Sequence, residues 1–146
     1  MKVSAAARGR ARRIAMQSLY QWQMTDNALH VIEAECHVEN DMDKVDTDYY
    51  SAIFHGVAKS KSEIDELFKP FLVGLRLDQV DPITLAILRM ATWELKERID
   101  VPYRVVINEA INLTKKYGAA DSHKFINGVL DKVAPRLRAA EIGAAK

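Results

Sequence analysis

Cysteine is nearly absent from this sequence: Cys36 is the only one among 146 residues, so an internal disulfide is excluded. A lone thiol fits a reducing compartment. No apolar run approaches the roughly 20 residues that cross a bilayer. The basic N-terminus lacks the apolar core and cleavage pattern of a secretory signal. We therefore expect a cytoplasmic protein that has no membrane association.

Enzymatic motifs are missing as well. The sequence contains neither a glycine-rich phosphate loop nor a Gly-x-Ser-x-Gly nucleophile turn. His30, Cys36 and His37 have spacings of six and one, which do not converge on a metal ion. Cys36 also lacks a visible orienting group and pocket for nucleophilic catalysis. We predict no catalytic residue, no metal and no cofactor.

The remaining acidic candidates have structural interpretations. Glu94 and Glu97 are expected to be surface partners of the neighbouring Lys96 and Arg98. Asn108 and Glu109 precede a helical stripe and are interpreted as capping residues or as hydrogen-bonding residues between helices. None of these residues forms a convincing acid–base pair.

Strand patterns are also lacking, because no period-2 alternation is sustained. Apolar residues instead recur at helical spacing almost throughout, for example at Ala11, Ala15, Leu19 and Trp22. The predicted fold class is all-α, a bundle of about six or seven helices in one domain covering residues 1–146. Two three-helix sub-bundles are expected, at about 1–77 and 80–142.

Several local signals place the helix ends. Asp81-Pro82 predicts the start of a central buried helix, with Asp as the N-cap. Gly118 is expected to end the next helix in a left-handed conformation, and Ser122 to cap the last major one. The tail after about Arg138 is expected to fray.

Other segments give weaker signals. A short helix is expected over about Leu29–Cys36, followed by a solvated acidic loop over 39–48. The stretch from Ser60 to Glu63 has a capping-box pattern, and Pro70 ends or kinks the helix behind it.

Charge is unevenly distributed, although the formal net charge is only +1. Residues 1–24 hold five Lys/Arg, including Lys2, and no acid; residues 26–48 hold eight acids and one Lys; residues 115–138 hold six basic residues and two acids. A near-neutral total therefore hides two basic ends, which are a recognised footprint of polyanion binding.

Four arginines in the first helix are candidates for binding RNA: Arg8, Arg10, Arg12 and Arg13. At about 100° per residue, Arg10 and Arg13 lie away from the apolar stripe, as does Tyr20. Arg8 and Arg12 lie in line with it but before it gains bulk, so we expect them to overhang the protein body. Arginines track phosphates and stack on bases; the alternative is a solvated basic helix end.

A second polar cluster lies in residues 121–131. Lys124 and Asn127 share one helical face, and Phe125 beside them is a platform on which an unpaired base could stack. Gly128 costs about 1 kcal/mol inside a helix, which close approach of a helix or ligand would explain. Alternatively, Phe125 belongs to the core, Gly128 marks a tight helix crossing, and Asp121 merely caps.

The sequence also resembles a known family, the NusB family of bacterial transcription antitermination factors. The resemblance rests on the following blocks: Arg8-Gly-Arg-Ala-Arg, Ala15-Met-Gln-Ser-Leu-Tyr-Gln-Trp, Ile87-Leu-Arg-Met-Ala-Thr-Trp-Glu-Leu, Asp100-Val-Pro-Tyr, Ile107-Asn-Glu-Ala-Ile-Asn-Leu and Ser122-His-Lys-Phe-Ile-Asn-Gly-Val-Leu-Asp. It covers nearly the whole chain and is weakest over 26–48 and the tail.

This resemblance implies a non-catalytic RNA-binding adaptor made of two helical bundles. Such proteins bind a short single-stranded element, boxA, in leader transcripts of ribosomal RNA operons, together with NusE, a ribosomal protein of the small subunit. The complex joins RNA polymerase with NusA and NusG and promotes reading through terminators. Family members can also self-associate as homodimers that occlude the partner surface.

The resemblance further implies roles for particular residues. The arginine-rich helix corresponds to Arg8, Arg10, Arg12 and Arg13, and the final motif adds Lys124, Phe125 and Asn127 beside Tyr20. Asp121, an acid next to that surface, should weaken RNA binding. Gly9 interrupts a basic run that is often continuous in the family.

Three alternatives remain open from the sequence. The chain could be a scaffold whose basic helix meets an acidic protein partner. It could be an RNA-recognition domain detached from an rRNA methyltransferase, although no methyl-donor-binding strand–loop–helix is present. A DNA-binding helix-turn-helix is disfavoured because no short turn lies beside a basic recognition helix.

Overall fold

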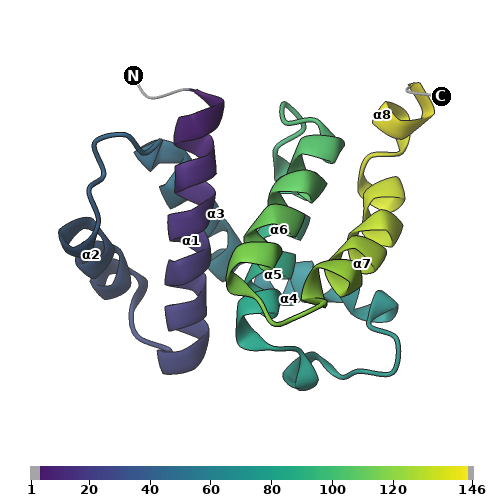
Figure 1. Cartoon of the computed structure of the whole chain (residues 1–146), viewed down its shortest axis with the longest axis horizontal. Coiled ribbons are helices and arrows are strands. Elements are labelled where there is room, and N and C mark those ends of the chain that lie inside the picture. Colours follow the sequence, from purple (N-terminus) through teal and green to yellow (C-terminus); the bar gives the residue numbers. More distant parts are fainter. Residues whose placement is uncertain (1–3, 145–146) are drawn as a thin grey trace.

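The protein is an all-helical bundle in the computed structural model, which describes residues 4–144 (Figure 1). Lys2, counted in the basic N-terminal segment, lies outside this range. No strand occurs in the described part, which confirms the predicted fold class. The helices are α1 (Ala5–Thr25), α2 (Leu29–Glu39), α3 (Thr47–Lys59), α4 (Lys61–Phe68), α5 (Pro82–Glu97), α6 (Tyr103–Tyr117), α7 (Ser122–Leu137) and α8 (Ala139–Ala144), with 3-10 turns at Lys69–Phe71 and Leu77–Gln79.

Helix α5 is the centre of the molecule. It starts as predicted: the side chain of Asp81 accepts a hydrogen bond from the backbone N–H of Thr84 at 3.1 Å, and Pro82 occupies the first helical position. Every residue from Ala86 to Leu95 is buried. Helices α1, α3, α4, α6 and α7 all pack against it.

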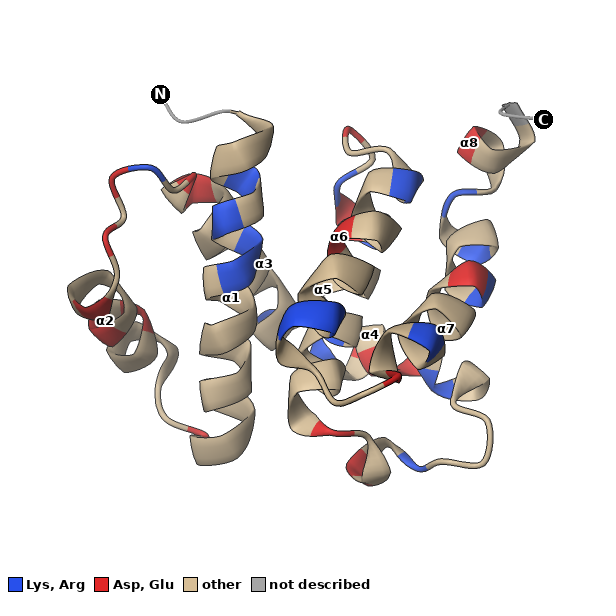
Figure 2. Cartoon of the chain, in the orientation of Figure 1, with Lys and Arg blue, Asp and Glu red and all other residues tan. Residues whose placement is uncertain are grey.

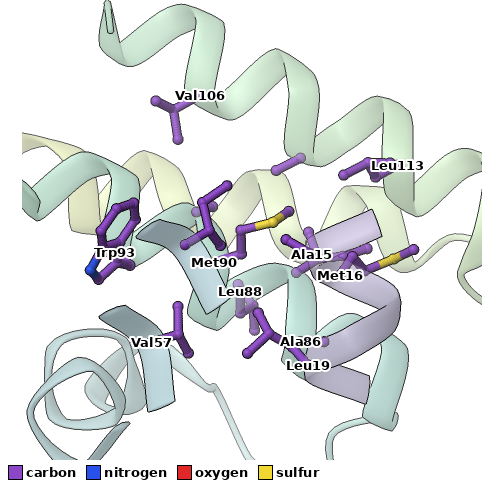
Figure 3. Close-up of a cluster of buried hydrophobic side chains, with 14 of the residues drawn as sticks. Ala15, Met16, Leu19, Val57, Ala86, Leu88, Met90, Trp93, Val106 and Leu113 are labelled. Atoms are coloured by element: carbon purple, nitrogen blue, oxygen red, sulfur yellow. The ribbon is translucent and has the colours of Figure 1, made fainter. Parts of the chain in front are cut away.

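The core therefore forms around α5 and draws on both halves of the chain (Figure 3). Figure 3 labels buried side chains from four helices: Ala15, Met16 and Leu19 of α1, Val57 of α3, Ala86, Leu88, Met90 and Trp93 of α5, and Val106 and Leu113 of α6. Helix α1 packs mainly on α3 and α5, whereas α6 packs mainly on α5 and α7. Helices α1 and α6 both pack on α5, and a groove lies between them.

Two helix ends differ from the sequence prediction. Gly118 has φ −86° and ψ 175°, an extended and not a left-handed conformation, and a Cβ there would lie 2.8 Å from the carbonyl oxygen of Thr114. Glycine is therefore required for close approach of the chain to α6. The left-handed residue is Asp121, with φ 67°; it precedes α7, so Ser122 is not the cap.

Ser60 also makes no capping hydrogen bond to α4. Helix α2 ends at Glu39, close to its expected end. The acidic loop behind it is not wholly solvated, because Val45 and Asp46 are buried. Helix α4 ends at Phe68, ahead of Pro70 as predicted.

Residues 139–144 form a helix, contrary to the expectation that the chain frays after Arg138. Arg138 is only 3% exposed and donates hydrogen bonds to backbone carbonyl oxygens of α5 and the α5–α6 turn. The acceptors are Glu94, Leu95, Arg98 and Val101, at 2.7–3.2 Å. Glu141 accepts from the N–H of Tyr103 at 2.9 Å and so caps α6. We call these contacts of Arg138 and Glu141 the C-terminal clamp. They hold α8, the eighth helix of the described residues, whereas six or seven were expected.

Candidate nucleic-acid interface

The four candidate arginines lie on α1. Ser4 caps the start of this helix, because its hydroxyl accepts a hydrogen bond from the N–H of Ala7 at 3.0 Å. The arginines divide into two pairs. Arg10 is exposed and Arg13 half-buried, whereas Arg12 is buried and Arg8 is engaged in ion pairs. Arg10 matches the exposed position that the register predicts, and Arg13 matches it in part.

Arg12 is part of the interior, so the expected overhang is wrong for this residue. It is 3% exposed, and its guanidinium donates to both carboxylate oxygens of Glu94 at 2.8–3.1 Å. Glu94, expected on the surface beside Lys96 and Arg98, is 1% exposed. The apolar stripe carries Arg12 inward, and a bidentate carboxylate is what makes a buried guanidinium tolerable.

Tyr49 completes this buried cluster. Its hydroxyl donates to Glu94 Oε2 at 2.5 Å. Burial, together with the negative charge of Glu94, raises the pKa of Tyr49 far above its ordinary value. Burial acts to lower the pKa of Arg12, but the hydrogen bond to Glu94 and the electrostatic interactions with Glu94, Tyr49 and Glu109 together outweigh it, so the pKa is raised. Arg12 thus stays charged and Tyr49 stays protonated, and the ion pair with Glu94 balances the charge of Arg12 inside the protein.

Arg8 lies at the edge of the same cluster and does not overhang freely. Its guanidinium lies 3.7 Å from Asp46, 3.4 Å from Asp100 and 4.6 Å from the ring centroid of Tyr49. Asp100 also accepts two hydrogen bonds from Arg98, which lower its pKa to about 2. Arg8 is therefore balanced by two carboxylates and offers little net charge to a polyanion.

A groove of about 350 Å³ separates α1 from α6, and it gathers the basic residues that remain accessible. It is lined by Ala6, Gly9, Arg10, Arg13, Glu109, Asn112, Leu113, Lys116 and Tyr117. In Figure 2 the basic segment of α1 faces the basic C-terminal turn of α6. Arg10 is anchored by a hydrogen bond from its guanidinium to the carbonyl oxygen of Lys44, at 3.1 Å. Cations and an aromatic ring on facing helices suit a single-stranded nucleic acid.

Sequence reasoning missed the α6 side of this groove. Glu109, Asn112 and Lys116 recur at i, i+3 and i+7, so they form one polar face of α6. That periodicity was available in the sequence, but its apposition to α1 was not. Glu109 also lies 3.6 Å from Arg12, which agrees with its interpretation as a residue that links helices.

Tyr20 is 37% exposed and lies on α1, seven residues after Arg13. Two helical turns place it on the same face, about 10 Å further along the axis. It lies outside the lining of the groove. Its role in RNA binding remains a prediction.

The other candidates lie on α7 around a second, smaller groove of about 250 Å³. Phe125 is half-buried and packs against the core while also lining this groove, and Asn127 is exposed. Lys124 and Asp121 are both exposed, and their side chains form an ion pair at 3.6 Å. Gly128 does not mark a tight helix crossing, because a Cβ there would meet nothing within 4 Å.

The two candidate surfaces are separate. The α1–α6 groove and the α7 groove share no lining residue. In Figure 2 the C-terminal turn of α6 lies between α1 and α7. The predicted residues thus form two separate surfaces, with the C-terminal turn of α6 between α1 and α7.

Other chemistry finds no support in residues 4–144. No group of three or more His, Cys, Asp or Glu side chains in this range is arranged to hold a metal ion. Among the same residues, no helix has the length and apolar character needed to cross a bilayer.

Comparison with known proteins identifies the family to which this sequence is similar. A family model described as the NusB family matches residues 9–135. A transcription antitermination protein NusB from Saccharophagus degradans is 69% identical over 99% of this chain and 96% of its own length. Another, from Teredinibacter turnerae, is 65% identical over 100% of this chain and 99% of its own length.

Solved structures share the fold. T. maritima NusB has a TM-score of 0.83 at 30% identity, covering 98% of this chain and 99% of its own. A chain from a crystal structure of antitermination factors NusB and NusE in complex with double-stranded RNA has a TM-score of 0.80 at 23% identity, covering 91% of this chain and 99% of its own. At that identity the second likeness concerns the fold alone.

Proposed function

The chain belongs to the NusB family of transcription antitermination factors, which are not enzymes, and on that premise we propose that it binds single-stranded boxA-type leader RNA of ribosomal RNA operons. The RNA runs along the groove between α1 and α6. One RNA-binding domain, covering residues 1–146, carries this activity in the cytoplasm.

The distribution of unpaired charge supports this proposal most strongly. Arg10, Arg13 and Lys116 line one groove, whereas Arg8 and Arg12 are balanced by carboxylates. Phosphate contacts dominate the affinity of proteins for nucleic acids, and unpaired cations supply them. Arg12 accordingly supports α1 and does not itself bind a phosphate. This revises its sequence-based role.

The α7 surface extends the binding region in this proposal. Lys124 contacts a phosphate, Phe125 offers a ring edge to a base, and Asn127 adds hydrogen bonds. Tyr20 offers a further stacking surface, and Asp121 opposes the phosphate charge.

Protein partners form the other half of the proposed function. A structure related in fold contains NusE and RNA beside its NusB chain, which supports a NusE complex for this chain too. Within that complex the chain would act on RNA polymerase together with NusA and NusG. A homodimer is the competing state, and it would hide the surface that receives NusE.

A fluorescence-anisotropy titration tests the proposal. A boxA-like RNA and a scrambled control are titrated with the protein, with and without NusE, at two salt concentrations. Tighter binding of the boxA-like RNA in the presence of NusE is expected. Equal, salt-driven binding to both RNAs would refute sequence-specific recognition. Affinity no better than that of a similarly charged control protein would favour a scaffold for an acidic protein.

A further inference from the structure

Building on the proposed function, we infer that Glu109 and Asn112 read the edge of one unpaired RNA base in the α1–α6 groove, and that this base is guanine. Specificity then comes from Glu109 and Asn112, which form the floor of the groove. Affinity comes from the cations at its rim, Arg10, Arg13 and Lys116. The floor thus adds an acid and an amide of α6 to a surface otherwise defined by Arg10, Arg13, Lys116 and Tyr117.

The groove is open because α1 presents small residues at its mouth. Ala6 and Gly9 line it, and a Cβ built on Gly9 would lie 4.0 Å from Glu109 Oε1 without touching anything closer. The volume of about 350 Å³ lies within the range of small-ligand pockets. A flat base therefore has room between α1 and α6.

Glu109 is held in place and remains accessible. Its Oε1 lies 3.6 Å from the guanidinium of Arg12, and its side chain is 34% exposed. Arg12 is itself fixed by the two oxygens of Glu94. The buried pair thus orients a carboxylate that lines the groove, and an oriented acceptor costs less entropy on binding than a mobile one.

The chemistry of a carboxylate selects the base. An ionised carboxylate only accepts hydrogen bonds, and it can accept two side by side. Guanine carries two adjacent donors on its Watson–Crick edge, N1–H and the N2 amino group, whereas adenine and cytosine carry one amino group and uracil one N–H. Asn112, one turn further along α6 and exposed, can donate its amide N–H to the O6 of guanine.

The rim fits the remainder of the nucleotide. Arg10 and Arg13 on α1 and Lys116 on α6 can contact flanking phosphates, and Tyr117 at the end of the groove can stack on a base. The acid on the floor would oppose RNA if it met only phosphate. Because Glu109 lies among three cations, the groove instead suits a nucleotide whose phosphates contact the cations and whose base donates hydrogen bonds to the carboxylate.

The test uses short uridine oligomers that carry one guanine, adenine, cytosine or inosine at a single position. Anisotropy titrations with the full chain, in the presence of NusE, give a preference ratio for each base. The guanine oligomer is expected to bind about tenfold more tightly than the adenine oligomer, with inosine intermediate because it lacks the N2 amino group. Glu109→Gln and Asn112→Ala should reduce that ratio toward one while leaving the salt slope unchanged.

The control is Glu39→Gln, which removes an exposed acid at the end of α2, outside both grooves, and should leave the ratio unchanged. Thermal unfolding of each variant confirms that it is folded. Equal affinity of the wild type for all four oligomers overturns the inference but leaves RNA binding intact. A Glu109→Gln variant that binds every oligomer more tightly by the same factor also overturns it, because the carboxylate would then act through repulsion alone. Absence of RNA binding altogether would refute the proposed function itself.

Discussion

Arg10 and Arg12 are two positions apart on α1, but Arg10 is exposed and Arg12 is buried. Their replacement should therefore change the free energy of unfolding by very different amounts. Arg12→Met leaves Glu94 buried without its partner and should lower the free energy of unfolding by about 3–5 kcal/mol. Arg10→Ala should change it by less than about 0.5 kcal/mol. Urea unfolding of both variants measures the difference.

The salt dependence of RNA binding gives a second test of Arg10, and a combined replacement gives a second test of Arg12. Arg10→Ala should lower the salt slope of RNA binding by about 1, because one phosphate contact is lost. Replacing Arg12, Glu94 and Tyr49 together by Met, Leu and Phe, so that no buried hydroxyl loses its acceptor, should recover much of the stability lost in Arg12→Met. An unchanged slope in Arg10→Ala would remove that residue from the interface.

Asp121 gives a second residue-scale prediction. Asp121→Asn should raise RNA affinity roughly 2- to 5-fold, because it removes a negative charge and releases Lys124 from its ion pair. Asparagine tolerates the left-handed backbone that Asp121 adopts, so the fold is preserved. Asp26→Asn is the matched control, since Asp26 is also left-handed, at φ 56°, and ends α1. Unchanged or weaker binding of the Asp121 variant by anisotropy would contradict the prediction.

The pKa of Asp100 makes a pH-dependent prediction. Hydrogen bonds from Arg98 lower this pKa from 3.8 to about 2, so the carboxylate stabilises the folded state fully above pH 4. That contribution is lost as the pH falls from about 4 to about 2, and it is small because the pair is solvent-exposed. Denaturant unfolding of wild type and Asp100→Asn should therefore differ at pH 7 and converge near pH 2. A constant difference across this range would show that the ion pair is not its source.

At the scale of elements, the C-terminal clamp is the least expected part of the fold. Arg138→Met would leave carbonyl oxygens of α5 and the following turn without donors, at a cost of at least about 3 kcal/mol. Arg136→Met is the control, because Arg136 is exposed and only covers the ring of Phe71. Hydrogen exchange should show faster opening of the α5–α6 turn in the Arg138 variant only. Equal protection in both variants would argue against the clamp.

Helices were predictable where the signals are local. The start of α5 follows from Asp81-Pro82, because a cap and a proline act within one turn. The clamp was not predictable, since Arg138 binds carbonyls about 40 residues earlier in the chain. The conformation of Gly118 was also missed: glycine fits both a left-handed residue and a close approach, and sequence does not distinguish them.

At the scale of the whole molecule, α5 joins the two expected sub-bundles. Because α1 packs on α5, which lies beyond residue 80, both halves should unfold in one transition. Trp22 on α1 and Trp93 on α5 provide fluorescence probes in the two halves, and far-UV circular dichroism reports all helices. The midpoints of single-Trp variants should coincide with that of the helical signal. Two separate midpoints would establish independent sub-bundles at about 1–77 and 80–142.

The candidate site depends on contacts between residues that lie far apart in the sequence. Charge distribution identified α1 as the basic helix, but not which arginines are neutralised, because Glu94 lies 82 residues from Arg12. The groove needs α6 as well, and its Lys116 lies more than 100 residues from Arg10 along the chain. A helical register fixes the direction of each side chain, whereas only the packed fold determines what each side chain meets.

The buried pair of Arg12 and Glu94 also constrains how such a sequence can diverge. Loss of either residue alone costs about 3–5 kcal/mol, a large share of the 5–15 kcal/mol that holds a typical domain together. Replacement of both by well-packed apolar residues costs far less, provided that Tyr49 loses its hydroxyl as well, since this hydroxyl donates to Glu94. Among descendants of a common ancestor, positions 12 and 94 should therefore change together or not at all. Position 10 is exposed, so it can vary with the RNA that the protein binds.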